Sequence, residues 1–133
     1  MLIKALGTIE VVTLFVEDLI AAREFYTAVF AWECVYEDDV SSVLKFDNIM
    51  VNLLQAGNAD ELVKPAPVGV AGSGSRFIFT VNVPDTDAVC RELTKRNVPL
   101  LNGPIDRVWG RRTAAFADPA GHVWEVAQNL DDV

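Results

Sequence analysis

The chain has 133 residues, 51% of them apolar, and a formal net charge of −8. Such a chain suits one folded domain and is not disordered or fibrous, and it needs no disulfide or metal ion to fold. The acidic charge excludes the basic footprint that nucleic acids and anionic membranes require, and no apolar run is long enough to span a membrane. Cys34 and Cys90 form no Cys-x-x-Cys unit and no signal segment opens the chain, so we expect a cytoplasmic protein with reduced thiols.

The first half predicts one strand, one helix and three further strands. A β-branched and aromatic run forms a strand through Val16, and Asp18 follows as the N-cap of a helix over 19–31. Apolar residues at helical spacing predict that this helix buries one stripe, made of Ala21, Phe25, Ala28 and Val29. Acidic or Asn-containing turns then separate three predicted strands, at 33–38, 41–46 and 49–55.

Residues 56–75 are rich in Pro, Gly, Ala and Ser and predict a linker or a long surface loop. The earlier pattern then restarts with a strand at 76–83, a helix capped by Asp85, and three short strands around 98–101, 111–118 and 122–128. Asn97 suits the left-handed position after the helix, and Asp118 to Gly121 suits a type I turn that joins the last two strands as a hairpin.

The order of strand, helix and three strands therefore occurs twice, with a faint echo between "VEDLIAARE" and "VPDTDAVCRE". A duplicated βαβββ unit is the natural interpretation. We expect a single α+β domain over 1–133, made of module 1 (7–55), the linker (56–75) and module 2 (76–129). Its two half-sheets form a cup-shaped mixed sheet with the helices on the outside.

Three stretches carry a resemblance to a known family: "VTLFVEDLIAAREFY", "VNVPDTDAVCRELTKRNV" and "WGRRTAAFADPAGHVWEVAQ". With them the chain resembles the vicinal oxygen chelate superfamily of glyoxalases, bleomycin-resistance proteins and extradiol dioxygenases, and within it the small, uncharacterised glyoxalase-like proteins. The last stretch is the most specific, because it reproduces Trp-Gly, Asp-Pro-x-Gly-His and a glutamate inside an apolar strand. The resemblance implies paired βαβββ modules and a homodimer with two clefts.

Metal-using members of this superfamily hold a divalent ion with one His, Glu or Gln from the first strand and one from the last strand of each module. The first-strand positions are counted back from the helix caps, and the late position of module 1 comes from aligning its Asp47-Asn48 turn with Gly121-His122. The four positions are then Val11, Val51, Ile78 and Glu125. One carboxylate cannot hold zinc or nickel, which need about three donors, so we expect no metal and no other cofactor.

We do not expect His122 to act as a second metal ligand. It lies three residues from Glu125, and because strand side chains alternate between faces, the two side chains point to opposite sides of the sheet. A one-residue error in register would bring Glu10 or Asn52 onto the inner face, which is still a poor site for a soft metal.

With this register the inner face carries Thr13 and Phe15 from module 1, and Thr80 and Glu125 from module 2. An apolar hollow with a few polar groups is how small-molecule pockets are lined. Glu125 has two interpretations. In the first, Glu125 lies at a solvent-exposed strand end and has no functional role. In the second, it lies inside the hollow and acts as a general base or binds a cationic group.

Three more residues are candidate ligand contacts, each with a structural alternative. Asn52 interrupts "IMVNLL" and either ties down a loop or contacts a ligand; Trp109 either stacks on a flat ligand or packs in its loop. Arg111 and Arg112 alternate on a strand, and we select Arg112 as the one that contacts Glu125 or an anionic substrate, the alternative being a solvated side chain.

Two functions follow. The first is metal-independent binding of a small hydrophobic or cationic molecule in a dimeric cleft, as in the sequestration performed by bleomycin-resistance proteins. The alternative is a lyase or isomerase of the glyoxalase type, acting on an α-keto or thiohemiacetal substrate with Glu125 as the catalytic base. Without a metal the enolate lacks its main electrostatic partner, which weakens the enzyme hypothesis. A scaffold without a pocket is the third option.

Overall fold

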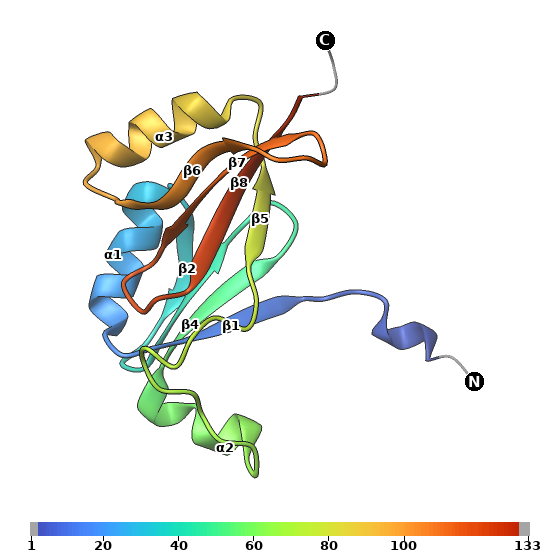
Figure 1. Ribbon diagram of the computed structural model, residues 1–133. Helices are drawn as coiled ribbons and strands as arrows, with labels where there is room; N and C mark the ends of the chain where they lie inside the picture. The colour runs from blue at the N-terminus through green and yellow to red at the C-terminus, as the bar shows by residue number, and fades with distance from the viewer. Residues whose placement is uncertain (1–2, 131–133) are drawn as a thin grey trace. The chain divides into compact units, whose positions relative to one another are not determined.

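The computed structural model describes residues 3–130, which divide between Val70 and Ala71 into two compact units. The first unit contains module 1 and the second contains module 2. Figure 1 shows the elements of each. No helix among residues 3–130 is long and apolar enough to cross a membrane.

Module 1 is a four-stranded mixed sheet covered on one face by a helix. Its elements are β1 (Val11–Val16), α1 (Leu19–Val29), β2 (Glu33–Glu37), β3 (Ser41–Lys45) and β4 (Met50–Gln55). The strand order is β1-β4-β3-β2, in which only β1 and β4 are parallel. The helix α1 packs on β3 and β4, and the module buries an apolar core that includes Leu14, Val16, Tyr26, Leu44 and Leu53.

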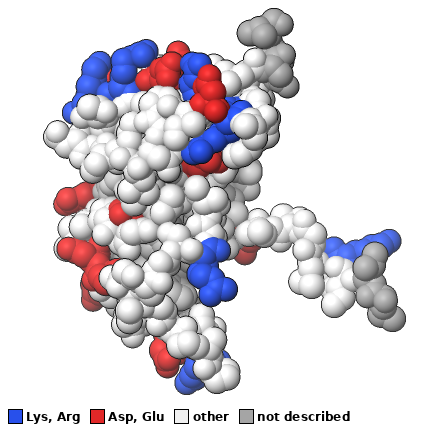
Figure 2. Space-filling model, in the orientation of Figure 1, with Lys and Arg blue, Asp and Glu red and all other residues white. Residues whose placement is uncertain are grey.

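Module 2 repeats this arrangement. Its elements are β5 (Phe79–Asn82), α3 (Thr86–Lys95), β6 (Leu100–Asp106), β7 (Arg111–Ala117) and β8 (Val123–Asn129). The strand order is β5-β8-β7-β6, again with one parallel pair, β5 and β8. The helix α3 packs on β6, β7 and β8, and Figure 2 shows basic and acidic side chains side by side on its outer surface. The expected α+β class with two βαβββ modules is confirmed.

The local signals at the ends of the elements are also confirmed. Asp18 and Asp85 cap their helices, since their Oδ1 atoms accept hydrogen bonds from the Ala21 and Ala88 amides at 3.1 and 3.0 Å. Asn97 has a φ of 60°, and the Asp118 carbonyl accepts from the Gly121 amide at 3.0 Å. These features depend on contacts within a few residues, which sequence patterns report well.

Two expectations were wrong in detail. The buried residues of α1 are Leu19, Ala22 and Tyr26, one step around the helix from the predicted stripe. The stretch from 56 to 75 is also not entirely irregular, since it contains the 3-10 helix η2 (Ala56–Asn58) and the short helix α2 (Asp60–Val63). Another 3-10 helix, η1 (Lys4–Leu6), precedes β1.

Candidate functional site

A repeated glutamine contact fixes which positions of the two modules correspond. In module 1 the Gln55 Oε1 accepts a hydrogen bond from the Leu19 amide at 3.3 Å, and in module 2 the Gln128 Oε1 accepts one from the Thr86 amide at 2.9 Å. Each glutamine lies at the end of its module's last strand and satisfies an amide at the start of that module's helix, which the helix itself leaves without a partner. Gln55 and Gln128 are therefore equivalent, and three residues before them lie Asn52 and Glu125.

The expected late position of module 1, Val51, is therefore wrong by one residue. Val51 is buried, and its side chain lies on the α1 face of the sheet together with that of Gln55. Asn52 lies on the opposite face, paired with Thr13 of β1, as Glu125 is paired with Thr80 of β5. The error arose because the turn was aligned one residue out of register, and a one-residue slip moves a strand side chain to the other face.

We call the sheet face opposite the helix the open face of each module. In module 2 the open face carries Glu125. Arg112 and Gln128 contact α3 and therefore lie on the other face. Glu125 Oε1 accepts a hydrogen bond from the Thr80 hydroxyl at 2.9 Å, and both side chains are accessible to solvent. The neighbours of Glu125 along β7 and β8 on this face are small, namely Ala115, Ala127 and Thr113.

The open face of module 1 carries the equivalent pair, Thr13 and Asn52, with Phe15 two residues further along β1. The Asn52 Oδ1 is buried and has no hydrogen-bond partner among the described residues. A buried amide oxygen without a donor costs about 1–3 kcal/mol, so this position can accept a hydrogen bond from a ligand. Phe15 is partly exposed and supplies an apolar surface beside it.

The four family ligand positions are now Val11 and Asn52 in module 1, and Ile78 and Glu125 in module 2. Within each module, one member is aliphatic and the other is an amide or a carboxylate. In residues 3–130, no three His, Cys, Asp or Glu side chains gather where they could hold a metal ion. An amide oxygen and a single carboxylate do not fit the donor set of a catalytic zinc, nickel or iron site.

Arg112 is on the face of module 2 that does not carry Glu125. Its Nε donates to Asp106 at 2.6 Å and its Nη1 to Asp87 at 3.1 Å, so it ties β6 to the first turn of α3. The paired guanidinium holds the pKa of the Asp106 carboxyl below its usual value. The structure instead places Arg111 on the open face with Glu125, four residues away along the strand pair. Sequence alternation alone did not say which of the two arginines shares that face.

Trp109 lies in the tight connection between β6 and β7 with 67% of its surface exposed. Its ring is 5.9 Å from the guanidinium carbon of Arg107, a cation–π distance. Trp109 is therefore available for stacking, and it does not pack into a core.

His122 belongs to the turn between β7 and β8. Its Nδ1 is 2.7 Å from the Asp118 Oδ2, and its backbone amide donates to the Asp118 Oδ1 at 2.8 Å. The Asp118 side chain is fully buried. His122 therefore stabilises the turn that brings Glu125 into β8.

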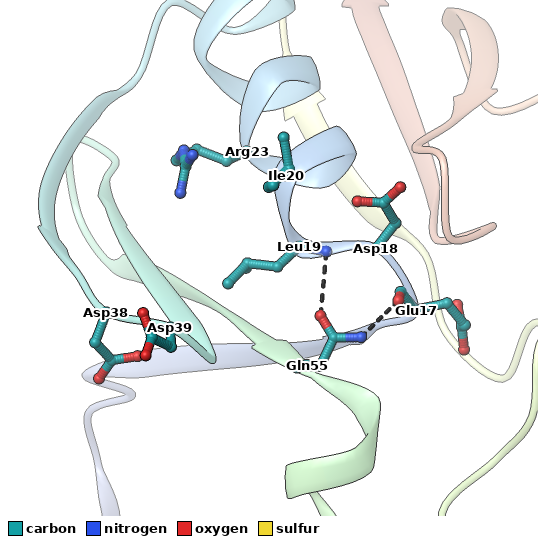
Figure 3. Close-up of a pocket in the computed structure, with 8 residues that line it drawn as sticks. All are labelled: Glu17, Asp18, Leu19, Ile20, Arg23, Asp38, Asp39 and Gln55. Carbon is teal, nitrogen blue, oxygen red and sulfur yellow. Dashed lines mark hydrogen bonds between the residues drawn. The ribbon is translucent and has the colours of Figure 1, made fainter.

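Module 1 also contains a cavity of about 440 Å³ that the sequence did not predict, shown in Figure 3. Four carboxylates and Arg23 line it, but most of its groups already have structural partners. Asp18 caps α1, Gln55 joins the Glu17 carbonyl to the Leu19 amide, and Arg23 pairs with Glu37 at 2.7 Å. The polar groups of this cavity therefore hold β4 and α1 together. The open faces are the better candidate site, because their central polar groups do not have this structural role.

Comparisons with known proteins agree with this architecture. The family model described as "Glyoxalase/Bleomycin resistance protein/Dioxygenase superfamily" matches residues 8–126. A search of curated proteins finds no significant match.

Solved structures resemble the chain over nearly its whole length. A glyoxalase/bleomycin resistance protein/dioxygenase from Nocardioides is 23% identical with a TM-score of 0.84, and the match covers 96% of this chain and 86% of that one. A glyoxalase-related enzyme from Fulvimarina pelagi is 26% identical with a TM-score of 0.79, covering 93% and 89%. TnmS3, an antibiotic binding protein from Streptomyces sp. CB03234, is 22% identical with a TM-score of 0.70, covering 94% and 98%.

Proposed function

Because this chain belongs to the glyoxalase/bleomycin resistance protein/dioxygenase superfamily, we propose that it binds a small organic molecule on its open faces without a metal ion. The observation that carries the proposal is the donor set at the four family positions, in which one carboxylate, one amide and two aliphatic side chains replace metal ligands. Such a set recognises a ligand by hydrogen bonds, charge and apolar contact. The fold shared with TnmS3, an antibiotic binding protein, supports sequestration as the biological role.

Each open face by itself suits a different ligand group. The open face of module 2 suits a cationic group, because Glu125 supplies a negative charge there. The open face of module 1 suits a flat hydrophobic molecule with a hydrogen-bond donor, because Asn52 supplies an acceptor without a partner among the described residues and Phe15 supplies an apolar surface. Thr13 and Thr80 add hydroxyls next to the two central groups.

A ligand that binds only the folded protein raises the melting temperature, so binding is tested by thermal shift against planar aromatic cations, α-keto compounds and divalent metal ions. We expect a shift with an aromatic cation that is strongly reduced in Glu125→Gln. The matched control is Glu24→Gln, which removes one exposed carboxylate from α1 and leaves the shift unchanged. A large shift with zinc or nickel, lost in Glu125→Gln, contradicts the metal-independent proposal.

The second candidate is a glyoxalase-type lyase or isomerase with Glu125 as the base, which the likeness to a glyoxalase-related enzyme favours. The Thr80 hydroxyl argues against it, because its hydrogen bond at 2.9 Å already occupies the Glu125 Oε1, one of the two oxygens that a base would offer to a substrate proton. The test is turnover of the thiohemiacetal of glutathione and methylglyoxal. Turnover that is lost in Glu125→Gln and kept in Glu24→Gln establishes the enzyme.

We also propose that the chain forms a homodimer, as the resemblance implies. Light scattering after size-exclusion chromatography measures the mass directly. A mass of one chain at micromolar concentration contradicts this proposal and leaves the ligand-binding proposal intact.

A further inference from the structure

Two arginines face each other where the β6–β7 hairpin closes. The Arg107 amide donates to the Arg111 carbonyl at 2.7 Å, and the next cross-strand pairs are Asp106 with Arg112 and Ile105 with Thr113. Arg107 and Arg111 are therefore directly opposite and point to the same face. That face is the open face of module 2, since Arg107 Nε donates to the Thr113 hydroxyl at 2.9 Å.

Neither of these two guanidiniums has a negatively charged partner within the described part of the chain. No carboxylate of residues 3–130 forms an ion pair with either of them. Their hydrogen bonds go to neutral groups, from Arg107 to Thr113 and Asn102 and from Arg111 to the Ala127 carbonyl. The neighbouring Arg112, by contrast, lies between two carboxylates.

The Arg111 Nε is in addition a buried donor with no acceptor. Leaving a donor of a charged group buried and unpaired is unfavourable, and like charges placed opposite each other across two strands repel. The chain carries 19 acidic residues against 11 basic ones, so a carboxylate partner is not scarce. Arg107 and Arg111 are both partly exposed, so an external anion can approach the pair and offset the repulsion between their charges.

We propose that Arg107 and Arg111 form a binding site for an oxyanion, a carboxylate or phosphate group of a small molecule. A guanidinium presents parallel N–H donors that match the two oxygens of such a group. Trp109, exposed beside Arg107, provides a flat surface for the rest of that molecule.

This site is separate from the contacts proposed around Glu125. Arg111 and the residue opposite Glu125, Ala115, are four residues apart on one strand, which corresponds to about 13 Å. The two proposals can therefore be tested independently, and we expect Glu125→Gln to leave anion binding at the arginine pair intact.

The test follows the Arg Nε–H resonances of the full chain by nuclear magnetic resonance during titration with inorganic phosphate, and in a second arm with benzoate, at constant ionic strength set with chloride. We expect saturable shifts of the Arg107 and Arg111 resonances with at least one probe, and the arm that binds more tightly distinguishes phosphate from carboxylate. Arg111→Gln weakens binding at least about tenfold, because it removes a charge-assisted contact. The absence of saturable shifts with both probes overturns the proposal.

Two further variants test whether anion binding is specific to the Arg107 and Arg111 pair. Arg91→Gln removes one exposed charge from α3, and we expect it to leave the affinity unchanged; an equal loss shows a general charge effect and overturns the site. Asp131 and Asp132 lie outside the described residues, so their double change to Asn tests the chain's own tail. Movement of the Arg111 resonance in this variant without any probe shows that the tail carboxylates occupy the arginine pair, and the proposal then fails.

Discussion

Gly103 offers a test of how closely β6 and β7 pack beneath the open face of module 2. Its φ is +92°, in the left-handed region, and a Cβ there meets the Thr113 carbonyl oxygen at 2.4 Å and the Ala114 Cα at 2.7 Å. Both are backbone atoms of β7, which cannot turn aside as a flexible side chain does. Gly103→Ala therefore requires the two strands to separate.

The matched control is Gly110→Ala in the same hairpin, where φ is +86° and a Cβ meets nothing within 4 Å. The left-handed conformation costs alanine about 1–2 kcal/mol, partly offset by about 0.4–1 kcal/mol from the stiffer unfolded chain. Gly110→Ala thus lowers the free energy of unfolding by about 1 kcal/mol. Gly103→Ala adds overpacking worth about 1–3 kcal/mol, for a total of about 3 kcal/mol.

Guanidinium unfolding followed by circular dichroism and tryptophan fluorescence measures both variants under the same conditions. The reasoning rests on the difference between them, since backbone strain is common to both. Equal destabilisation by the two substitutions would refute the close approach of β6 to β7.

Three further predictions concern ion pairing, capping and the core. Arg112 lowers the pKa of the Asp106 carboxyl, so the ion pair stabilises the fold above the unfolded pKa of Asp106 and this stabilisation is lost as the pH falls through the folded pKa. Melting temperatures measured from pH 6 to pH 3 should therefore fall less steeply in Arg112→Gln than in the unmodified protein. An unchanged slope contradicts the pairing. Asp85→Ala removes the α3 cap and should cost about 1 kcal/mol in urea unfolding, whereas Asp85→Asn should cost less; equal losses argue against capping. Tyr26→Ala should cost about 3–5 kcal/mol in the same assay, because this ring is fully buried and stacks on Trp32 at 5.3 Å, and a loss below 1 kcal/mol contradicts that packing.

The sequence by itself determined the features that depend on neighbouring residues. The helix caps, the Asp118 turn, the left-handed Asn97 and the order of the elements all follow from local chemistry, and the duplicated order identified the two βαβββ modules. The side of β8 that Glu125 occupies was also predictable, because the strand alternates between buried Trp124 and Val126 and the carboxylate between them, whereas its pairing with Thr80 came from the structure.

Only the tertiary structure decided which face a side chain occupies where the pattern was ambiguous. The run "IMVNLL" is apolar on both sides of Asn52, and α1 has apolar residues around most of its circumference, so pairing and packing selected Asn52 over Val51 and Tyr26 over Phe25. Likewise, adjacent arginines in β7 are equivalent in sequence, and long-range partners assigned Arg112 to two carboxylates and left Arg111 beside Arg107. A strand or helix reverses its exposed side with a one-residue shift, and only contacts between distant segments carry the free energy that prevents the shift.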